Sequence, residues 1–222
     1  MSFLDQLNQI QREAVQAIDG PVMIVAGAGS GKTRVLTFRA AHLLHLGVAP
    51  ESVLALTFTN KAADEMKGRI SSLVGVASKN IWMGTFHSIF ARILRIECER
   101  IGYARNFTIY DADDSLSVIK GVMTALEISQ QQFNPHALRS RISTAKNQML
   151  TPKNYLAKVS DPIGERAALV YEEYEKRLLA SNAMDFDDLL LKPMDLFAKH
   201  RDVLDRYHYR FKYILVDEYQ DT

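Results

Sequence analysis

The segment Val22–Thr33 constrains the fold most, because apolar residues lead into a glycine-rich turn that ends in Gly-Lys-Thr. A helical pattern follows at once, which is the strand–loop–helix context of a phosphate-binding P-loop. Gly27, Gly29 and Gly31 permit backbone conformations closed to residues with a Cβ, so consecutive N–H groups can point at an anion. The helix that begins near Lys32 adds its own unpaired N–H groups. The segment therefore predicts a site for a nucleoside triphosphate.

Two side chains of the turn have distinct expected roles. Lys32 would reach the β- and γ-phosphates, and the Thr33 hydroxyl would ligate Mg²⁺. The general pattern has glycine at its first position, where this chain has Ala26. Taken alone, the turn leaves a second interpretation open, a glycine-rich strand-to-helix connection that binds nothing.

Composition narrows the class of protein. The 222 residues are 47% apolar and 24% charged, as in an ordinary globular protein of one or two domains. The sequence has neither an apolar run of roughly 20 residues nor a secretion signal at its start. Its one cysteine, Cys98, excludes an internal disulfide and is expected to be a small buried or half-buried thiol. We expect a cytoplasmic protein. The net charge of +1 neither implies nor excludes a nucleic-acid partner.

Apolar, β-rich segments alternate with helical patterns over the first ninety residues. The strands are expected at Val22–Ala26, Val53–Phe58 and Ile81–Met83, and the helices at about Lys32–Leu46 and Lys61–Leu73. This alternation predicts a parallel α/β sheet.

Helical patterns dominate from Ser88 to about Tyr209. Asp111 or Asp113 can cap a helix that follows, and Pro193 should kink or break a helix that Asp185 opens. A buried strand, 213–216, then returns. The simplest architecture is an α/β domain interrupted by a mainly helical insertion.

An acidic pair follows this last strand and completes the predicted nucleotide site. Carboxyl ends of parallel strands meet at the crevice where ligands bind, so Asp217 should face Thr33. Asp217 would hold Mg²⁺, and Glu218 could position and deprotonate the attacking water.

At this point the chain resembles the UvrD/PcrA/Rep type of superfamily 1A DNA helicases. The segments that resemble the family's motifs, in the family's order, are 7–15 (Q motif), 26–34 (motif I), 57–63 (motif Ia), 85–88 (the motif that follows), 185–189 (helical insertion) and 217–222 (motif II). A P-loop that opens with alanine is usual in this family.

The resemblance implies a RecA-like P-loop NTPase sheet. It divides the chain into a first part of the ATP-binding domain (1–90), a helical insertion domain (91–208) and a return to the first domain (209–222). It implies an ATP-dependent helicase of DNA repair or replication that uses ATP and Mg²⁺ and moves 3′ to 5′ on single-stranded DNA. Single-stranded DNA and single/double-strand junctions are the expected partners, with no membrane; neither the pathway nor any protein partner can be inferred.

The resemblance also implies roles for individual residues. Gln11 would bind the adenine edge, Arg34 would stack on the adenine face, and Gln220 would act with Lys32 and Glu218 in catalysis by sensing the γ-phosphate. The implied nucleotide-binding set is Gln11, Ala26, Gly27, Ala28, Gly29, Ser30, Gly31, Lys32, Thr33 and Arg34. The implied track for single-stranded DNA is Thr57, Phe58, Thr59, Asn60, Thr85, Phe86 and His87.

The residues alone leave other interpretations open for this track. Phe58 and Phe86 could be plain core aromatics and His87 a structural histidine, and Trp82 is expected in the core. A stacking ring would suit DNA, because base–aromatic stacking tolerates any sequence.

A second DNA-contacting surface is expected in the insertion. Residues 128–160 hold five basic residues and no acid, and Arg139 and Lys146 share a helix face. We expect these two to contact the DNA backbone; an ordinary solvated basic face is the alternative.

The sequence ends inside motif II. The family's second RecA-like domain and a strand that lies between those of motifs I and II are not in it, so we expect an incomplete sheet and, for this chain alone, almost no ATP turnover. Two alternatives remain: a nucleotide- and DNA-binding module without useful catalysis, or the motor of a helicase–nuclease.

Overall fold

The computed structural model describes residues 3–27 and 29–221, without the side chain of Asp221. The chain divides into two compact units. The first comprises Met1–Ile89 with Leu204–Thr222, and the second comprises Phe90–Val203. Among the described residues, no helix is long and apolar enough to cross a membrane.

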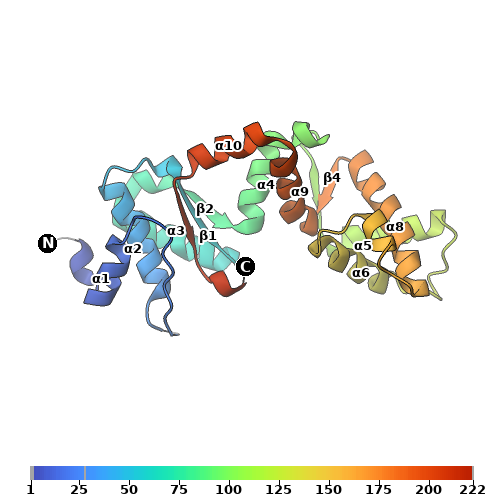
Figure 1. The fold of residues 1–222 in the computed structure, drawn as a ribbon, viewed down its shortest axis with the longest axis horizontal. Helices are drawn as coiled ribbons and strands as arrows, with labels where there is room; N and C mark the ends of the chain where they lie inside the picture. Colours follow the sequence, from blue (N-terminus) through green and yellow to red (C-terminus); the bar gives the residue numbers. More distant parts are fainter. Residues whose placement is uncertain (1–2, 28, 222) are drawn as a thin grey trace. The chain divides into compact units, whose positions relative to one another are not determined.

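The first unit is built on a parallel sheet of three strands in the order β2–β1–β5 (Figure 1). The strands are β1 (Val53–Thr57), β2 (Trp82–Thr85) and β5 (Tyr213–Val216). The helices of this unit are α1 (Gln9–Gln16), α2 (Lys32–His45), α3 (Asn60–Val74), the start of α4 (Phe86–Glu97) and the end of α10 (Arg201–Arg210), with short 3-10 turns at Phe3–Gln6, Pro50–Ser52, Gly75–Asn80 and Tyr219–Asp221.

One face of this sheet packs against α2 and α3. Val53 and Ala55 of β1 and Leu215 of β5 share a core with Leu36 of α2 and Met66 of α3. Side chains alternate between the two faces of a strand, so every second residue of β1 and β5 points toward these helices. Trp82 is buried, as expected, and packs against Tyr207 and Phe211.

The predicted strand Val22–Ala26 does not form. Residues 21–27 have no regular secondary structure, and Val25 is 88% exposed. A strand needs a neighbour for its backbone hydrogen bonds, and no described strand lies beside this segment. The edge of β5 that faces away from β1 is open as well, with Ile214 58% exposed. The sheet is therefore incomplete, as the sequence predicted.

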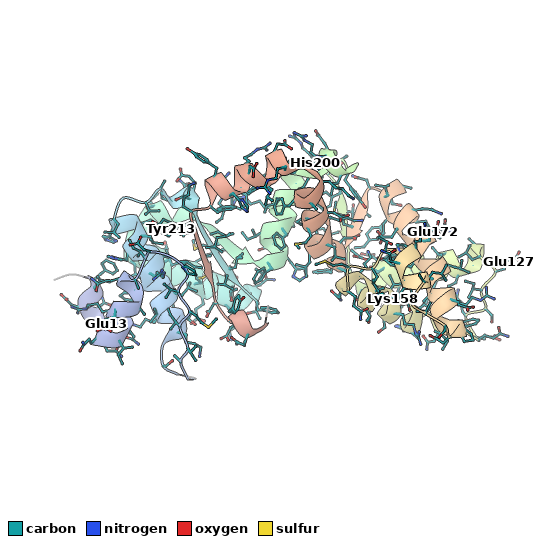
Figure 2. The ribbon with its side chains drawn as sticks, viewed as in Figure 1. Glu13, Glu127, Lys158, Glu172, His200 and Tyr213 are labelled. Atoms are coloured by element: carbon teal, nitrogen blue, oxygen red, sulfur yellow. The ribbon has the colours of Figure 1, made fainter. Side chains whose placement is uncertain are left out.

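The second unit is mainly helical. It holds most of α4, a 3-10 turn (Cys98–Ile101), α5 (Ala112–Ala125), α6 (Pro135–Asn147), α7 (Pro152–Leu156), α8 (Pro162–Ala180), α9 (Phe186–Lys199) and the two short parallel strands β3 (Thr108–Tyr110) and β4 (Ala183–Asp185). Its main core joins α5, α6 and α8 (Figure 1), whereas charged residues such as Lys158 and Glu172 lie on its exterior (Figure 2).

Several local predictions for this unit can be checked. Asp111 caps α5 in a reciprocal capping box with Asp114, and Cys98 is buried. Of the kink or break expected at Pro193, the break does not occur, since α9 continues through this residue to Lys199. Pro193 is buried between Leu189 and Leu196 on one face, and this packing outweighs the poor helix propensity of proline. The sequence analysis missed β4, which has only three residues.

Candidate nucleotide site and DNA-contacting residues

The glycine-rich turn enters α2 through a left-handed backbone. Gly29 has φ 75° and Gly31 has φ 88°, both in the region that favours glycine. Gly31 is the N-cap of α2, and no side chain caps that helix. The first N–H groups of α2 are thus left for a ligand, as in other anion sites at helix N-termini. Ala28, part of the predicted nucleotide-binding set, lies outside the described residues.

The Lys32 ammonium is held on the loop itself. Its Nζ donates hydrogen bonds to the carbonyl oxygens of Ala26, at 2.9 Å, and Gly27, at 3.2 Å. Ser30 Oγ also donates to the Gly27 carbonyl, at 2.6 Å. These bonds keep the lysine over the turn rather than in the core, so phosphate oxygens can replace the carbonyls as its acceptors.

Gln11 and Arg34 lie at the entrance of α2. Gln11 belongs to a capping box with Asn8 that begins α1, and its Nε2 donates to the Ser30 carbonyl at 3.0 Å. Arg34 Nη2 donates to the Gln6 carbonyl at 2.9 Å. The structure therefore brings both predicted adenine contacts next to the turn. Arg34 directly follows the turn in the sequence, whereas Gln11 is distant from it.

Arg39 supports this arrangement and was not predicted from the sequence. Arg39 of α2 is buried, and its Nη1 donates to the Ala14 carbonyl near the end of α1 at 2.8 Å. This bond fastens the helix of Gln11 to the helix that follows the turn. A charged residue within the apolar face of α2 was the signal that could have revealed it.

Thr33, in the first turn of α2, and Asp217, directly after β5, contact each other at the carboxyl edge of the sheet. Thr33 Oγ1 donates to Asp217 Oδ2 at 3.0 Å, and Asp217 N donates to the Leu56 carbonyl at 2.9 Å. A hydroxyl beside a carboxylate is the oxygen donor set that Mg²⁺ prefers, with phosphate and water supplying the remaining ligands. The two residues thus fit a magnesium site.

Glu218 and Gln220 follow Asp217 on the exposed side of the site. Glu218 N donates to Asp217 Oδ1 at 3.1 Å, and the Gln220 amide contacts the Glu218 carboxylate. Glu218 has φ 53°, a conformation that is unfavourable for a non-glycine residue and that concentrates at functional sites. Glu218 is exposed, so its carboxylate is open to solvent beside Asp217.

A cleft of about 950 Å³ runs beside this constellation. Its lining consists of residues 18–24, Lys32, Leu36, Arg39 and residues 212–220. Lys32, Asp217, Glu218 and Gln220 therefore border the same cleft. The strand β5, with its open edge, also lines the cleft, and Glu218 and Gln220 are exposed.

The predicted DNA track divides into exposed and buried residues. Phe58 is 47% exposed and packs edge-on against Phe86, with ring centroids 6.2 Å apart. Asn60 is exposed and His87 is half-buried. Thr59 is exposed, but its hydroxyl accepts a hydrogen bond from Ala62 N and so caps α3. Phe58 is therefore available for a ligand instead of being a core residue.

Two members of the track cannot contact DNA through their side chains. Thr57 is 1% exposed and Thr85 is 6% exposed, and they pair with each other between β1 and β2. Their strands are buried on both faces, which closes these positions to a DNA strand. The prediction of side-chain contacts from Thr57 and Thr85 is wrong.

The prediction for Lys146 is also wrong. The side chain is 1% exposed, and its ammonium lies 2.6 Å from Glu175 Oε1, 2.8 Å from Asp185 Oδ2 and 3.0 Å from Asp188 Oδ1. Burial alone lowers the pKa of Lys146, but these carboxylates outweigh it and hold the pKa well above its ordinary value. Burial raises the pKa of Asp188 to about 6 against the opposing charge of Lys146. Lys146 neutralises buried acids and cannot reach a phosphate.

Arg139 remains a candidate for contact with the DNA backbone. It is half-buried, and its Nη1 donates to the Ala112 carbonyl at 3.2 Å. Arg141 is paired with Asp161 at 2.9 Å, whereas Lys153 and Lys158 are exposed. Of the five basic residues in 128–160, Arg139, Lys153 and Lys158 therefore remain as candidates for DNA contact, because Lys146 is buried and Arg141 is paired.

Comparison with known proteins places the chain among helicases. A sequence profile described as "UvrD/REP helicase N-terminal domain" matches residues 7–222. The chain is 46% identical over 221 residues to the ATP-dependent DNA helicase PcrA of Bacillus subtilis (strain 168), which covers 99% of the chain. It is 48% identical over 222 residues, its whole length, to the protein of the same name from Staphylococcus aureus (strain Mu50). In both cases the match spans 30% of the relative's length.

Proposed function

Because the chain belongs to the UvrD/REP helicase N-terminal domain family, we propose that it is the ATP-binding part of an ATP-dependent DNA helicase that moves 3′ to 5′ on single strands. The observation that carries this proposal is the contact between Thr33 and Asp217 beside the P-loop. It joins the two halves of a phosphate and metal site from distant parts of the sequence.

In this proposal the nucleotide-binding residues act on successive parts of ATP. The backbone of 26–31 and Lys32 bind the phosphates, Gln11 and Arg34 bind the adenine, and Thr33 and Asp217 would hold Mg²⁺. Mg²⁺ held there would supply positive charge that offsets the charge of the phosphates. Glu218 accepts a proton from the attacking water, and Gln220, in contact with Glu218, senses the terminal phosphate.

Single-stranded DNA is the proposed partner of the exposed track. Phe58, with Phe86 beside it, offers a ring for base stacking, and Thr59, Asn60 and His87 flank it. Polar groups of this kind bind phosphates without reading sequence. Arg139, with exposed Lys153 and Lys158, is proposed to contact the backbone near a single/double-strand junction.

The domain assignment follows from these roles. We assign residues 1–90 and 209–222 to ATP binding and residues 91–208 to the insertion that carries the second basic surface; the two compact units divide one residue earlier, after Ile89, and five residues earlier, after Val203. A cytoplasmic location is part of the proposal, supported by the single reduced cysteine and by DNA as the substrate.

The test is ATP turnover by the natural protein that carries this sequence, with and without single-stranded DNA. We expect DNA to stimulate turnover, and Glu218→Gln to lower it by about 10²–10⁴-fold, since a general base contributes that much. The variant should still bind ATP. Turnover that ignores DNA and survives Glu218→Gln would contradict the proposal; binding of both ligands without turnover would favour a binding module.

A further inference from the structure

The hydroxyl of Thr57 is buried and has no hydrogen-bond partner. Two other atoms in the described part of the chain share this property, Glu175 Oε1 and Arg210 Nε. Each of these has another favourable contact, because Glu175 Oε1 lies 2.6 Å from the Lys146 ammonium and the Arg210 guanidinium lies over the Trp82 ring. Thr57 has no such contact. A buried unpaired hydroxyl costs free energy, so valine, which has the same shape, would suit packing better.

The position of Thr57 relates it to the metal site. Leu56 of β1 pairs with Val216 of β5, and Asp217 N donates to the Leu56 carbonyl at 2.9 Å. The next residues in this register are Thr57 and Asp217, on neighbouring strands about 4.8 Å apart. The two residues therefore lie side by side at the carboxyl edge of the sheet.

The side chains of Thr57 and Asp217 also share a face of the sheet. Val53 and Ala55 of β1 and Leu215 of β5 point toward α2 and α3. By the alternation of a strand, Thr57 and Asp217 point the same way. Thr33 starts α2 on that face and already bonds Asp217. The unpaired hydroxyl thus lies on the same face of the sheet as the proposed magnesium site.

We propose that Thr57 is a positioning residue for Asp217, an inference that rests on the proposed function of the site. In the structure, Thr33 supplies a hydrogen bond to Asp217 Oδ2. With Mg²⁺ and nucleotide bound, the Thr33 hydroxyl would face the metal and no longer bond Asp217. The Thr57 hydroxyl would then donate a hydrogen bond to the Asp217 carboxylate and hold the orientation of that carboxylate. Carboxylates at metal sites are regularly held by such hydrogen bonds, and removing the donor weakens metal affinity by about 10–100-fold.

The experiment compares Thr57→Val with Thr57→Ser in the natural protein that carries this sequence. Affinity for a fluorescent ATP analogue is measured with Mg²⁺ and with EDTA, and melting temperature is measured without nucleotide. We expect Thr57→Val to weaken the Mg²⁺-dependent affinity by about 10–100-fold. Its affinity in EDTA should equal that of the wild type, and its melting temperature should be unchanged or higher. Thr57→Ser should bind as the wild type does, because it keeps the hydroxyl.

Thr85→Val is the control for position, since Thr85 pairs with Thr57 on the side of β1 away from β5; its hydroxyl accepts a hydrogen bond from Ser88 N at 3.2 Å, so this variant can lower the melting temperature. It should leave the Mg²⁺-dependent affinity unchanged. The inference is overturned if Thr57→Val binds Mg²⁺-nucleotide like the wild type, or if it lowers melting temperature and affinity alike in Mg²⁺ and EDTA. Retained binding in Lys32→Ala would instead reject the nucleotide site itself, so the two failures are distinguishable.

Discussion

The Thr33 hydroxyl donates to the Asp217 carboxylate at 3.0 Å although the two residues are 184 positions apart. The contact exists because α2 begins where the sheet ends, so the start of the helix and the end of β5 meet at one edge. Every residue proposed to act on the phosphates lies in the turn that leads into α2, at the start of α2, or directly after β5. The fold of the first unit thus accounts for the candidate site directly.

Replacement of Gly31 by alanine should destabilise the protein by about 1–2 kcal/mol, because φ 88° places a Cβ in the left-handed region. The added Cβ would also lie 2.9 Å from Gln11 Nε2 and displace the proposed adenine contact. Urea unfolding and ATP-analogue affinity measure the two effects. Gly68→Ala in α3 is the control, since its Cβ meets nothing within 4 Å, and it should stabilise the protein. Equal effects of the two changes would refute this explanation.

Replacement of Phe58 by alanine should weaken binding of single-stranded DNA by about 1–3 kcal/mol, because one stacking ring is lost. The effect should be similar for homopolymers of different base, since every base offers a π-face. Fluorescence anisotropy with labelled oligonucleotides measures it. Tyr209→Ala removes an aromatic ring that is 79% exposed elsewhere in the first unit, and it should leave affinity unchanged. An unaltered affinity in the Phe58 variant would show that Phe58 has a packing role and does not bind DNA.

Replacement of Lys146 by methionine should destabilise the protein by about 3–5 kcal/mol, because buried Asp185 would lose its ion pair and buried Asp188 would keep only the longer pair with Lys192, at 3.6 Å. The exposed pair of Lys176 with Glu172 provides the control, since Lys176→Met should change stability by no more than about 0.5 kcal/mol. Denaturant unfolding measures both variants, and a loss near that of the control would contradict the burial of Lys146.

The same variant should show a defined pH dependence. Removing the Lys146 charge raises the pKa of folded Asp188 further above the unfolded value of about 3.9, from its present value of about 6. A carboxyl with a raised folded pKa binds more protons when folded, so stability falls as pH rises between the two values. The stability deficit of the variant should therefore be smaller at pH 5 than at pH 8; a deficit that does not change with pH would contradict this.

Local sequence patterns predicted much of the fold, whereas contacts between residues far apart in the sequence were harder to predict. The expected helix 61–73 corresponds to α3, and the capping role of Asp111 is confirmed, because caps and helix periodicity depend on nearby residues. The prediction of a strand at 22–26 was wrong because a strand needs a neighbouring strand for its hydrogen bonds, and no described strand pairs with this segment. The prediction of a DNA contact by Lys146 was wrong because its partners Asp185 and Asp188 lie 39 and 42 positions away in the sequence. The residues around Lys146 give no sign of these partners.

The most direct measurement for the nucleotide site is titration of Lys32→Ala with a fluorescent ATP analogue in the presence of Mg²⁺. Lys32 bonds only loop carbonyls in the described structure, so the variant should keep its fold, checked by circular dichroism, while nucleotide affinity is lost. Lys79→Ala, at an exposed lysine outside the site, should bind as the wild type does. Affinity in Lys32→Ala equal to that of the wild type would contradict the assignment of the turn as a phosphate site.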